Sequence, residues 1–189
     1  MLLQLDQLRL KRSSMKKRIY SVLVMLLIAT LITSTASAGG AIKLSGIAFN
    51  LGSLIASGFA SGLGNTDVTV VLDASGIPVS TCSNKGNNNV PGQSSPKISA
   101  AGEQDLLGSD GRTKNGKTAF FTETDDPETI AWDAAGCPNS NWTAFIDFIF
   151  WTDATLSVYD MHTGELLASQ SFTCTTTRFP ESVSCTPVE

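Results

Sequence analysis

Five acidic side chains lie close together in the middle of the chain, at Glu123, Asp125, Asp126, Glu128 and Asp133. Two carboxylates on opposite sides of a sugar bond can hydrolyse it. Loop oxygens can also bind calcium, although the EF-hand pattern is absent. Three interpretations follow: a solvated acidic loop, a calcium site formed by Asp125, Asp126, Glu128 and Asp133, or a glycosidase-like hydrolase that uses residues 123–133. The solvated loop requires the fewest assumptions.

Other catalytic chemistry finds little support in the residue types. His162 is the only histidine, and it stands in a predicted turn beside Gly164, where we expect it to be exposed. A Ser-His-Asp mechanism needs a histidine packed between a serine and a carboxylate. No G-x-S-x-G motif occurs either. We therefore expect a protein that is not an enzyme.

Trp132 and Trp142 are candidates for ligand binding, because they lie in or near a predicted loop that also carries Cys137. An indole offers a flat apolar face and one polar N–H group, which suits a carbohydrate ring. Residues 83–104 form a second predicted loop, rich in Asn, Gly, Ser and Pro, and loops of this length are often functional. Within it we select Asn87 and Asn88. The predicted ligand is a carbohydrate or another cell-surface component.

Four cysteines, Cys82, Cys137, Cys174 and Cys185, follow the N-terminal region. An even number of cysteines in an exported chain indicates disulfides. Of the three possible pairings we favour Cys82–Cys137, which ties a long loop to the core, and Cys174–Cys185, which closes a hairpin. No C-x-x-C pair supports a zinc site.

The N-terminal region is typical of an export signal. Lys16, Lys17 and Arg18 precede an apolar run over residues 22–32, and Ala36-Ser37-Ala38 matches a cleavage site. The run is shorter than the roughly 20 residues that cross a bilayer. We predict cleavage after Ala38, with the extension and signal peptide in residues 1–38 and a single secreted domain in residues 39–189. Met15 is an alternative start to Met1.

The predicted mature chain is acidic, with seven Lys or Arg residues against sixteen Asp or Glu residues and a net charge near −9. Nucleic acids need compensating cations, so we exclude them as partners. No membrane span is expected after cleavage. The charge favours a cationic partner, and localisation is predicted to be extracellular, at the cell surface, or periplasmic in a cell with an outer membrane.

The elements that must position these residues are predicted to be strands. In residues 143–151 the even positions are all apolar, as in a half-buried strand. Strands at 154–159 and 166–172 complete a three-stranded antiparallel meander, with a connection at 175–181 and a short strand at 183–185. Asp147 interrupts the first of these strands, and we favour an exposed position for it.

Further strands are predicted at residues 41–49, 67–74, 77–82 and 118–124, with a turn at Ser75-Gly76. Residues 52–64 read as a strand whose small residues admit a close backbone. This pattern favours an all-β, antiparallel two-sheet β-sandwich, immunoglobulin-like or fibronectin-like in broad shape. A jelly roll or small β-barrel is the alternative.

Together these features predict an exported, disulfide-stabilised, non-catalytic binding module or a surface or matrix module. Self-assembly would use exposed strand edges, with the flat Gly/Ala face of residues 52–64 as a candidate. The hydrolase is the alternative function.

Overall fold

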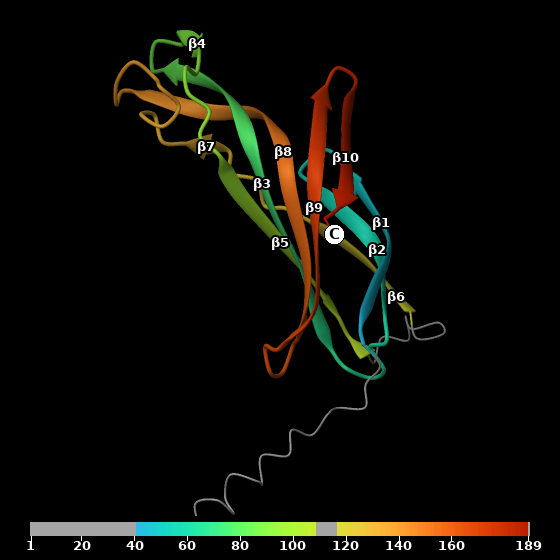
Figure 1. The fold of residues 1–189 in the computed structure, drawn as a ribbon. Coiled ribbons are helices and arrows are strands. Elements are labelled where there is room, and N and C mark those ends of the chain that lie inside the picture. The colour runs from blue at the N-terminus through green and yellow to red at the C-terminus, as the bar shows by residue number, and fades with distance from the viewer. Residues whose placement is uncertain (1–40, 109–116, 189) are drawn as a thin grey trace, which may run out of the picture. The chain divides into compact units, whose positions relative to one another are not determined.

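The computed structural model describes residues 41–108 and 117–188, which form β-strands and no α-helix (Figure 1). The predicted leader, residues 1–38, lies outside the described residues. The smaller sheet holds β1 (Lys43–Asn50), β2 (Ile55–Ser61) and β6 (Lys117–Glu123). The larger sheet holds β3 (Val68–Asn84), β4 (Asn89–Pro91), β5 (Ile98–Leu106), β7 (Thr129–Ile130), β8 (Trp142–Asp160), β9 (Leu166–Arg178) and β10 (Glu181–Pro187).

Every strand pair in the two sheets is antiparallel, so the predicted all-β, antiparallel class is confirmed. The smaller sheet has the order β1-β2-β6. The larger, curled sheet runs β10-β9-β8-β3-β4, with β5 on β3 and β7 on β8. β2 therefore has a partner on both edges. The expectation that residues 52–64 offer a free edge for self-assembly is wrong.

Two long strands organise the larger sheet. β3 and β8 pair from Val68↔Asp160 to Asn84↔Trp142 (Figure 1). The predicted turn at Ser75-Gly76 is wrong, because β3 continues through it with a register shift at that point. The shift leaves Thr152 of β8 as the extra residue. A Cβ at Gly76 would come within 2.7 Å of the Phe150 carbonyl oxygen, so glycine allows the bulged β8 backbone to approach β3 closely.

The even positions of residues 143–151 were predicted to form the buried face of this strand, and a second register shift explains why that holds only for the first part of β8. Val79 pairs with Phe148 while Ser80 pairs with Ile146, which leaves Asp147 as an extra residue. A one-residue insertion exchanges the two faces of a strand. Ala144 is buried as predicted, but beyond the bulge the buried positions are Ile149 and Trp151. Asp147 itself is exposed, as predicted, and accepts a hydrogen bond from Thr81 Oγ1 at 2.7 Å.

The main core draws on both sheets. Its largest fully buried side chains include Trp151, Leu54, Leu72 and Leu156. At the far end of the β3–β8 pair lies a second, smaller cluster, which consists of Cys82, Ala135, Cys137 and Ala144. Burial of apolar area is the main favourable term in folding, so the first cluster stabilises the body of the larger sheet and the second stabilises its end.

The predicted loop over residues 83–104 is partly wrong, because it contains β4 and most of β5. The inward positions of β5 include Ala100 and Gly102, whose small side chains give little hydrophobic periodicity. The small residues have a packing role: a Cβ at Gly102 would lie 1.7 Å from the Glu123 carbonyl oxygen. Only glycine allows the end of β6 to approach β5 so closely.

The C-terminal hairpin is longer than predicted. β9 continues to Arg178 and β10 begins at Glu181, so the predicted connection at 175–181 is mostly strand. Ser and Thr side chains on an exposed hairpin give no alternation of apolar and polar residues. The hydrophobic pattern therefore did not predict these parts of β9 and β10.

Candidate functional site

One end of the β3–β8 pair carries all of the predicted ligand-binding residues. We call it the disulfide tip and define it as residues 81–91 and 129–145. Cys82 and Cys137 form a disulfide here, 55 residues apart in sequence. The second disulfide joins Cys174 to Cys185, directly opposite each other in the β9–β10 hairpin. Both favoured pairings are present, and every described cysteine is paired.

A short turn places Asn87 and Asn88 at the surface of the disulfide tip. Asn84 Oδ1 accepts hydrogen bonds from the backbone N–H groups of Gly86 and Asn88, at 2.9 and 3.2 Å. Asn87 has a φ of 58°, a left-handed conformation that asparagine tolerates better than most residues. Both predicted asparagines are exposed, but their positions are explained by the turn itself.

The two tryptophans of the disulfide tip have different surroundings. Trp132 keeps 37% of its surface exposed, and its carbonyl oxygen accepts a hydrogen bond from Cys137 N–H at 2.8 Å. Trp142 pairs with Asn84 across the ladder and packs against the second core. Trp132 is therefore partly open to solvent, whereas Trp142 supports the tip from inside.

The predicted acidic set is spread over several places. Glu123 is exposed at the end of β6, and Asp125 is exposed with its N–H donating to the Ala101 carbonyl oxygen at 2.8 Å. Asp126 and Glu128 line a recess of about 250 Å³ together with Asp147, which the sequence did not assign to this group. Asp133 belongs to the disulfide tip, where its Oδ1 accepts a hydrogen bond from Ala134 N–H at 2.9 Å. Within residues 41–108 and 117–188, no three acidic, His or Cys side chains are arranged to hold a metal ion.

Asp126 is the acidic residue of this set whose environment changes its chemistry. Its carboxylate accepts a hydrogen bond of 2.6 Å from Thr124 Oγ1, which tends to lower its pKa. Burial outweighs that effect, and the negative charges of Glu123 and Asp125 act in the same direction as burial, so the pKa of Asp126 is raised above 3.8.

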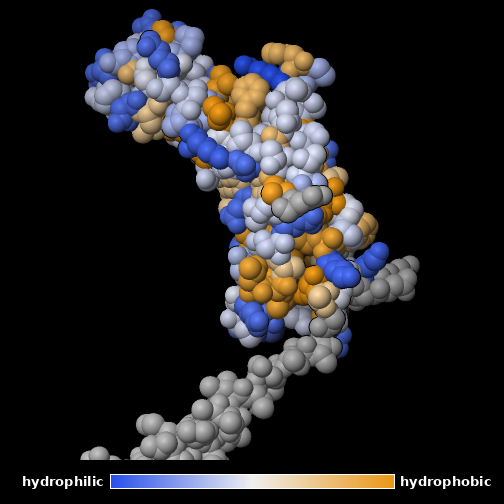
Figure 2. Space-filling view, viewed as in Figure 1, coloured by the Kyte–Doolittle hydropathy of each residue, from blue (hydrophilic) through white to orange (hydrophobic). Residues whose placement is uncertain are grey.

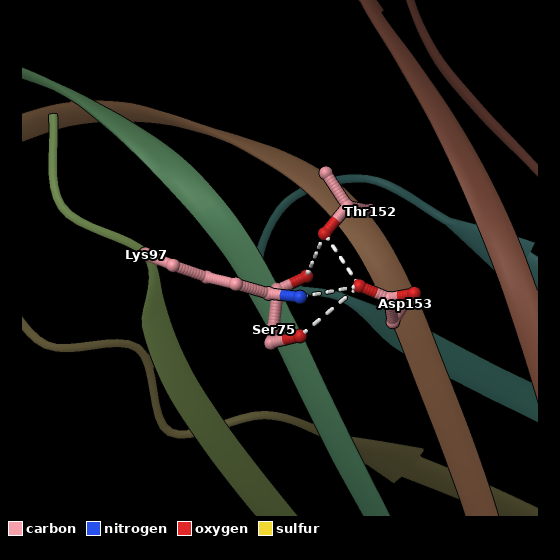
Figure 3. A network of polar contacts seen from close by, with 4 residues as sticks. All are labelled: Ser75, Lys97, Thr152 and Asp153. Carbon is pink, nitrogen blue, oxygen red and sulfur yellow. Dashed lines mark hydrogen bonds and ion pairs between the residues drawn. The ribbon is translucent and has the colours of Figure 1, made fainter.

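Asp153 is the centre of a polar network on the larger sheet (Figure 3). Its Oδ2 accepts from Lys97 Nζ at 2.7 Å, from Thr152 Oγ1 at 2.7 Å and from Ser75 Oγ at 3.4 Å. The hydrogen bond from Lys97 and then that from Thr152 lower the pKa of Asp153. A shallow recess of about 360 Å³ adjoins it across β5, β3 and β8.

Sequence reasoning missed this network for a clear reason. Lys97 and Asp153 are 56 residues apart, and only the β5–β3–β8 order brings them together. The bulge at Ser75/Gly76 is the one local signal, since bulges often re-aim side chains near functional positions. Both side chains are more than half exposed, so the ion pair is a weak one.

His162 lies in the β8–β9 turn, as predicted, with a side chain 72% exposed. Its Nε2 is 3.4 Å from Asp67 Oδ2, and the structure gives it no serine partner for a catalytic triad within the described residues. The surrounding turn is held by Asp160 Oδ1, which accepts from the N–H groups of His162 and Thr163 at 2.8 Å.

An aromatic surface lies between the β3–β8 pair and the β9–β10 hairpin, where Figure 2 shows exposed hydrophobic atoms. The rings of Phe148 and Phe150 meet edge to face at 5.0 Å. The Arg178 guanidinium stands 5.7 Å from the Phe148 ring and 5.6 Å from the Phe179 ring. Phe179 is 86% exposed at the hairpin turn.

Comparison with protein-family models, curated proteins and solved structures found no match for this chain. Among the described residues, no helix has the length and hydrophobicity needed to span a membrane.

Proposed function

We propose that this chain is an exported, non-catalytic binding module whose binding end is the disulfide tip. The observation that carries the proposal is the exposed Trp132 indole on a loop fixed by the Cys82–Cys137 disulfide. A rigid aromatic anchor loses little conformational entropy on binding. Two disulfides in an antiparallel β-protein suit an oxidising, extracellular compartment, which agrees with the export signal predicted in residues 1–38.

The proposed ligand is a saccharide, because an indole face stacks on the apolar face of a sugar ring while exposed amides such as Asn87 and Asn88 can exchange hydrogen bonds with its hydroxyl groups. The proposed architecture is a two-sheet sandwich, immunoglobulin-like in broad shape. It is supported by the main core, to which both sheets contribute side chains.

The test is an array of immobilised oligosaccharides probed with the wild-type chain, Trp132→Ala and Phe59→Ala. Phe59 is a matched control, because it is also an exposed aromatic residue but lies on β2 of the smaller sheet. We expect Trp132→Ala to lose at least tenfold in signal while Phe59→Ala retains it. A blank array, or equal signals from all three proteins, would contradict the proposal.

The alternative function, a carboxylate-dependent hydrolase, is favoured by one observation. Asp126 has a raised pKa, as a general acid requires, and shares a recess with Glu128. Hydrolysis of a chromogenic glycoside that disappears in both Asp126→Asn and Glu128→Gln would support this function over the binding module.

A further inference from the structure

The turn between β9 and β10 exposes the most accessible large apolar side chain of the described residues. Phe179 is 86% exposed there, against 57% or less for the other exposed hydrophobic side chains. Thr177 Oγ1 donates to the Pro180 carbonyl oxygen at 2.8 Å and lies 2.7 Å from Ser182 Oγ, so both strands hold the turn. Figure 1 shows it at the free end of the hairpin, beyond the ends of β1 and β2. A phenyl ring held in water at this point gains free energy from any apolar environment that it enters.

Arg178, beside this ring, is a cation without an acidic partner in the described part of the chain. Its guanidinium lies 5.6 Å from the Phe179 ring and 5.7 Å from the Phe148 ring. Glu181 stands opposite it in the ladder, but no ion pair joins the two. The N–H donors of Arg178 can therefore bind an external anion, and the planar guanidinium suits the oxygens of a phosphate or carboxylate.

The apolar surface continues from the turn onto the larger sheet. Phe148 and Phe150 are half-buried, and Ile77, which pairs with Phe150, is 43% exposed. The planes of the two phenyl rings differ by 74°, so these rings do not form the flat platform on which a sugar ring stacks. An irregular apolar surface around one cation instead fits a fluid apolar phase bordered by anions. The boundary between acyl chains and phosphate headgroups in a lipid bilayer has this character.

The charge pattern of the hairpin also favours a lipid surface. Arg178 and Glu181 are the only charged residues in 166–188, although the predicted mature chain has a net charge near −9. The two strands instead present exposed hydroxyl side chains, at Thr173, Thr175, Thr177, Ser182, Ser184 and Thr186. Hydroxyl groups are compatible with hydrated headgroups, whereas carboxylates are repelled by lipid phosphates. The hairpin therefore meets little repulsion at a phosphate-bearing surface, in contrast to the acidic chain as a whole.

We propose that the β9–β10 turn and the aromatic surface (Phe148, Phe150, Arg178 and Phe179) bind the headgroup layer of a phospholipid membrane. The Phe179 ring enters the boundary with the acyl chains, and the Arg178 guanidinium donates to phosphate oxygens. A second copy of this chain is a poorer occupant, because face-to-face contact would bring two Arg178 side chains together. This surface shares no residue with the disulfide tip, so the two proposals fail independently.

The test measures how much of the purified exported chain sediments with sucrose-loaded vesicles of phosphatidylcholine. One inserted ring and one ion contact give weak, reversible binding, so the lipid is titrated into the millimolar range. We expect Phe179→Ser to lower the apparent partition coefficient at least tenfold. Phe179→Leu keeps an apolar side chain and should stay within threefold of wild type. Phe121→Ser is the matched control and should stay within twofold, since Phe121 is also exposed but lies on β6 of the smaller sheet.

Two further measurements separate insertion from charge attraction. Arg178→Gln should weaken binding several-fold, because it removes the contact with phosphate. Replacement of part of the phosphatidylcholine by phosphatidylglycerol should not strengthen binding of the wild-type chain, since the predicted mature chain is itself acidic. Circular dichroism checks that each variant is folded.

Absence of sedimentation at the highest lipid concentration would overturn the proposal. So would equal losses in Phe179→Ser and Phe121→Ser, which would show general adsorption of exposed apolar groups. Binding that requires phosphatidylglycerol and persists in Phe179→Ser would show charge attraction without insertion, and would overturn it as well.

Discussion

Burial of the Asp126 carboxyl makes the folded protein hold that proton more tightly than the unfolded chain does. Because the folded pKa lies above the ordinary value of 3.8, the folded state binds more protons between these two values. The free energy of unfolding therefore decreases as the pH rises through this range. Ionised Asp126 costs stability at neutral pH and costs none well below pH 3.8.

Asp126→Asn should remove that cost while it keeps an oxygen that accepts from Thr124 Oγ1. We expect the melting temperature of the variant to match that of wild type well below pH 3.8 and to exceed it as the pH rises above that value toward neutral. Thermal unfolding by circular dichroism across this range provides the measurement. A difference independent of pH, or a variant less stable at neutral pH, would contradict the raised pKa.

At the scale of elements, the two disulfides restrain chain segments of different length. Cys82–Cys137 closes a separation of 55 residues and Cys174–Cys185 one of 11. Loop-closure entropy then gives upper values of about 4 and about 3 kcal/mol respectively. Cys82 and Cys137 also make up half of the second core, so their replacement removes packing at the disulfide tip as well.

We expect Cys82→Ala/Cys137→Ala to lower the free energy of unfolding more than Cys174→Ala/Cys185→Ala does, as measured by urea unfolding of each double variant. The first variant should also lose protection of the disulfide-tip amides from hydrogen exchange while the main core stays protected. A larger loss from the hairpin disulfide would show that loop closure does not govern these contributions.

The same elements show how far the sequence alone predicts this fold. Strong alternation in residues 67–74 and 118–124 identified β3 and β6, and the even cysteine count led to both pairings. The errors are local. Bulges of β8 at Thr152, opposite Gly76, and at Asp147 keep β3 and β8 paired. The Ser75-Gly76 turn signal and the even-position pattern of residues 143–151 predicted otherwise. β5 was not predicted, because its inward residues Ala100 and Gly102 are too small to give a hydrophobic alternation. Glycine is nevertheless required at position 102, where the Glu123 carbonyl oxygen approaches closely.

The candidate sites likewise divide into residues that could be predicted from their type and groupings that depend on how the strands pair. Trp132 was predictable from residue type, since an aromatic residue near a disulfide loop is an evident candidate for binding. The grouping of Asp126 and Glu128 with Asp147 and the Lys97–Asp153 network both depend on strand order and register. Such long-range pairings leave no trace in local periodicity.

For the whole molecule, the balance between charge and exposed apolar surface decides whether copies associate. Phe59 and Phe121 are 47% and 55% exposed on the smaller sheet, and exposed strand edges attract one another. Against this, the net charge near −9 of the predicted mature chain favours separate molecules at neutral pH. The edge strand β1 also carries Lys43 and a bulge between Ser45 and Ala48, both of which discourage edge pairing.

We therefore expect light scattering to show a monomer of residues 39–189 at pH 7 and growing particles as acid protonates the carboxylates and the net charge approaches zero. Light scattering after addition of calcium, and again after addition of a chelator, tests whether calcium specifically causes association. Because the described residues offer no three-ligand metal cluster, we expect calcium to produce no association that magnesium at the same concentration does not. Regular, large assemblies at pH 7 would instead favour a matrix subunit. Calcium-specific growth that a chelator reverses would contradict the expectation that calcium has no specific effect.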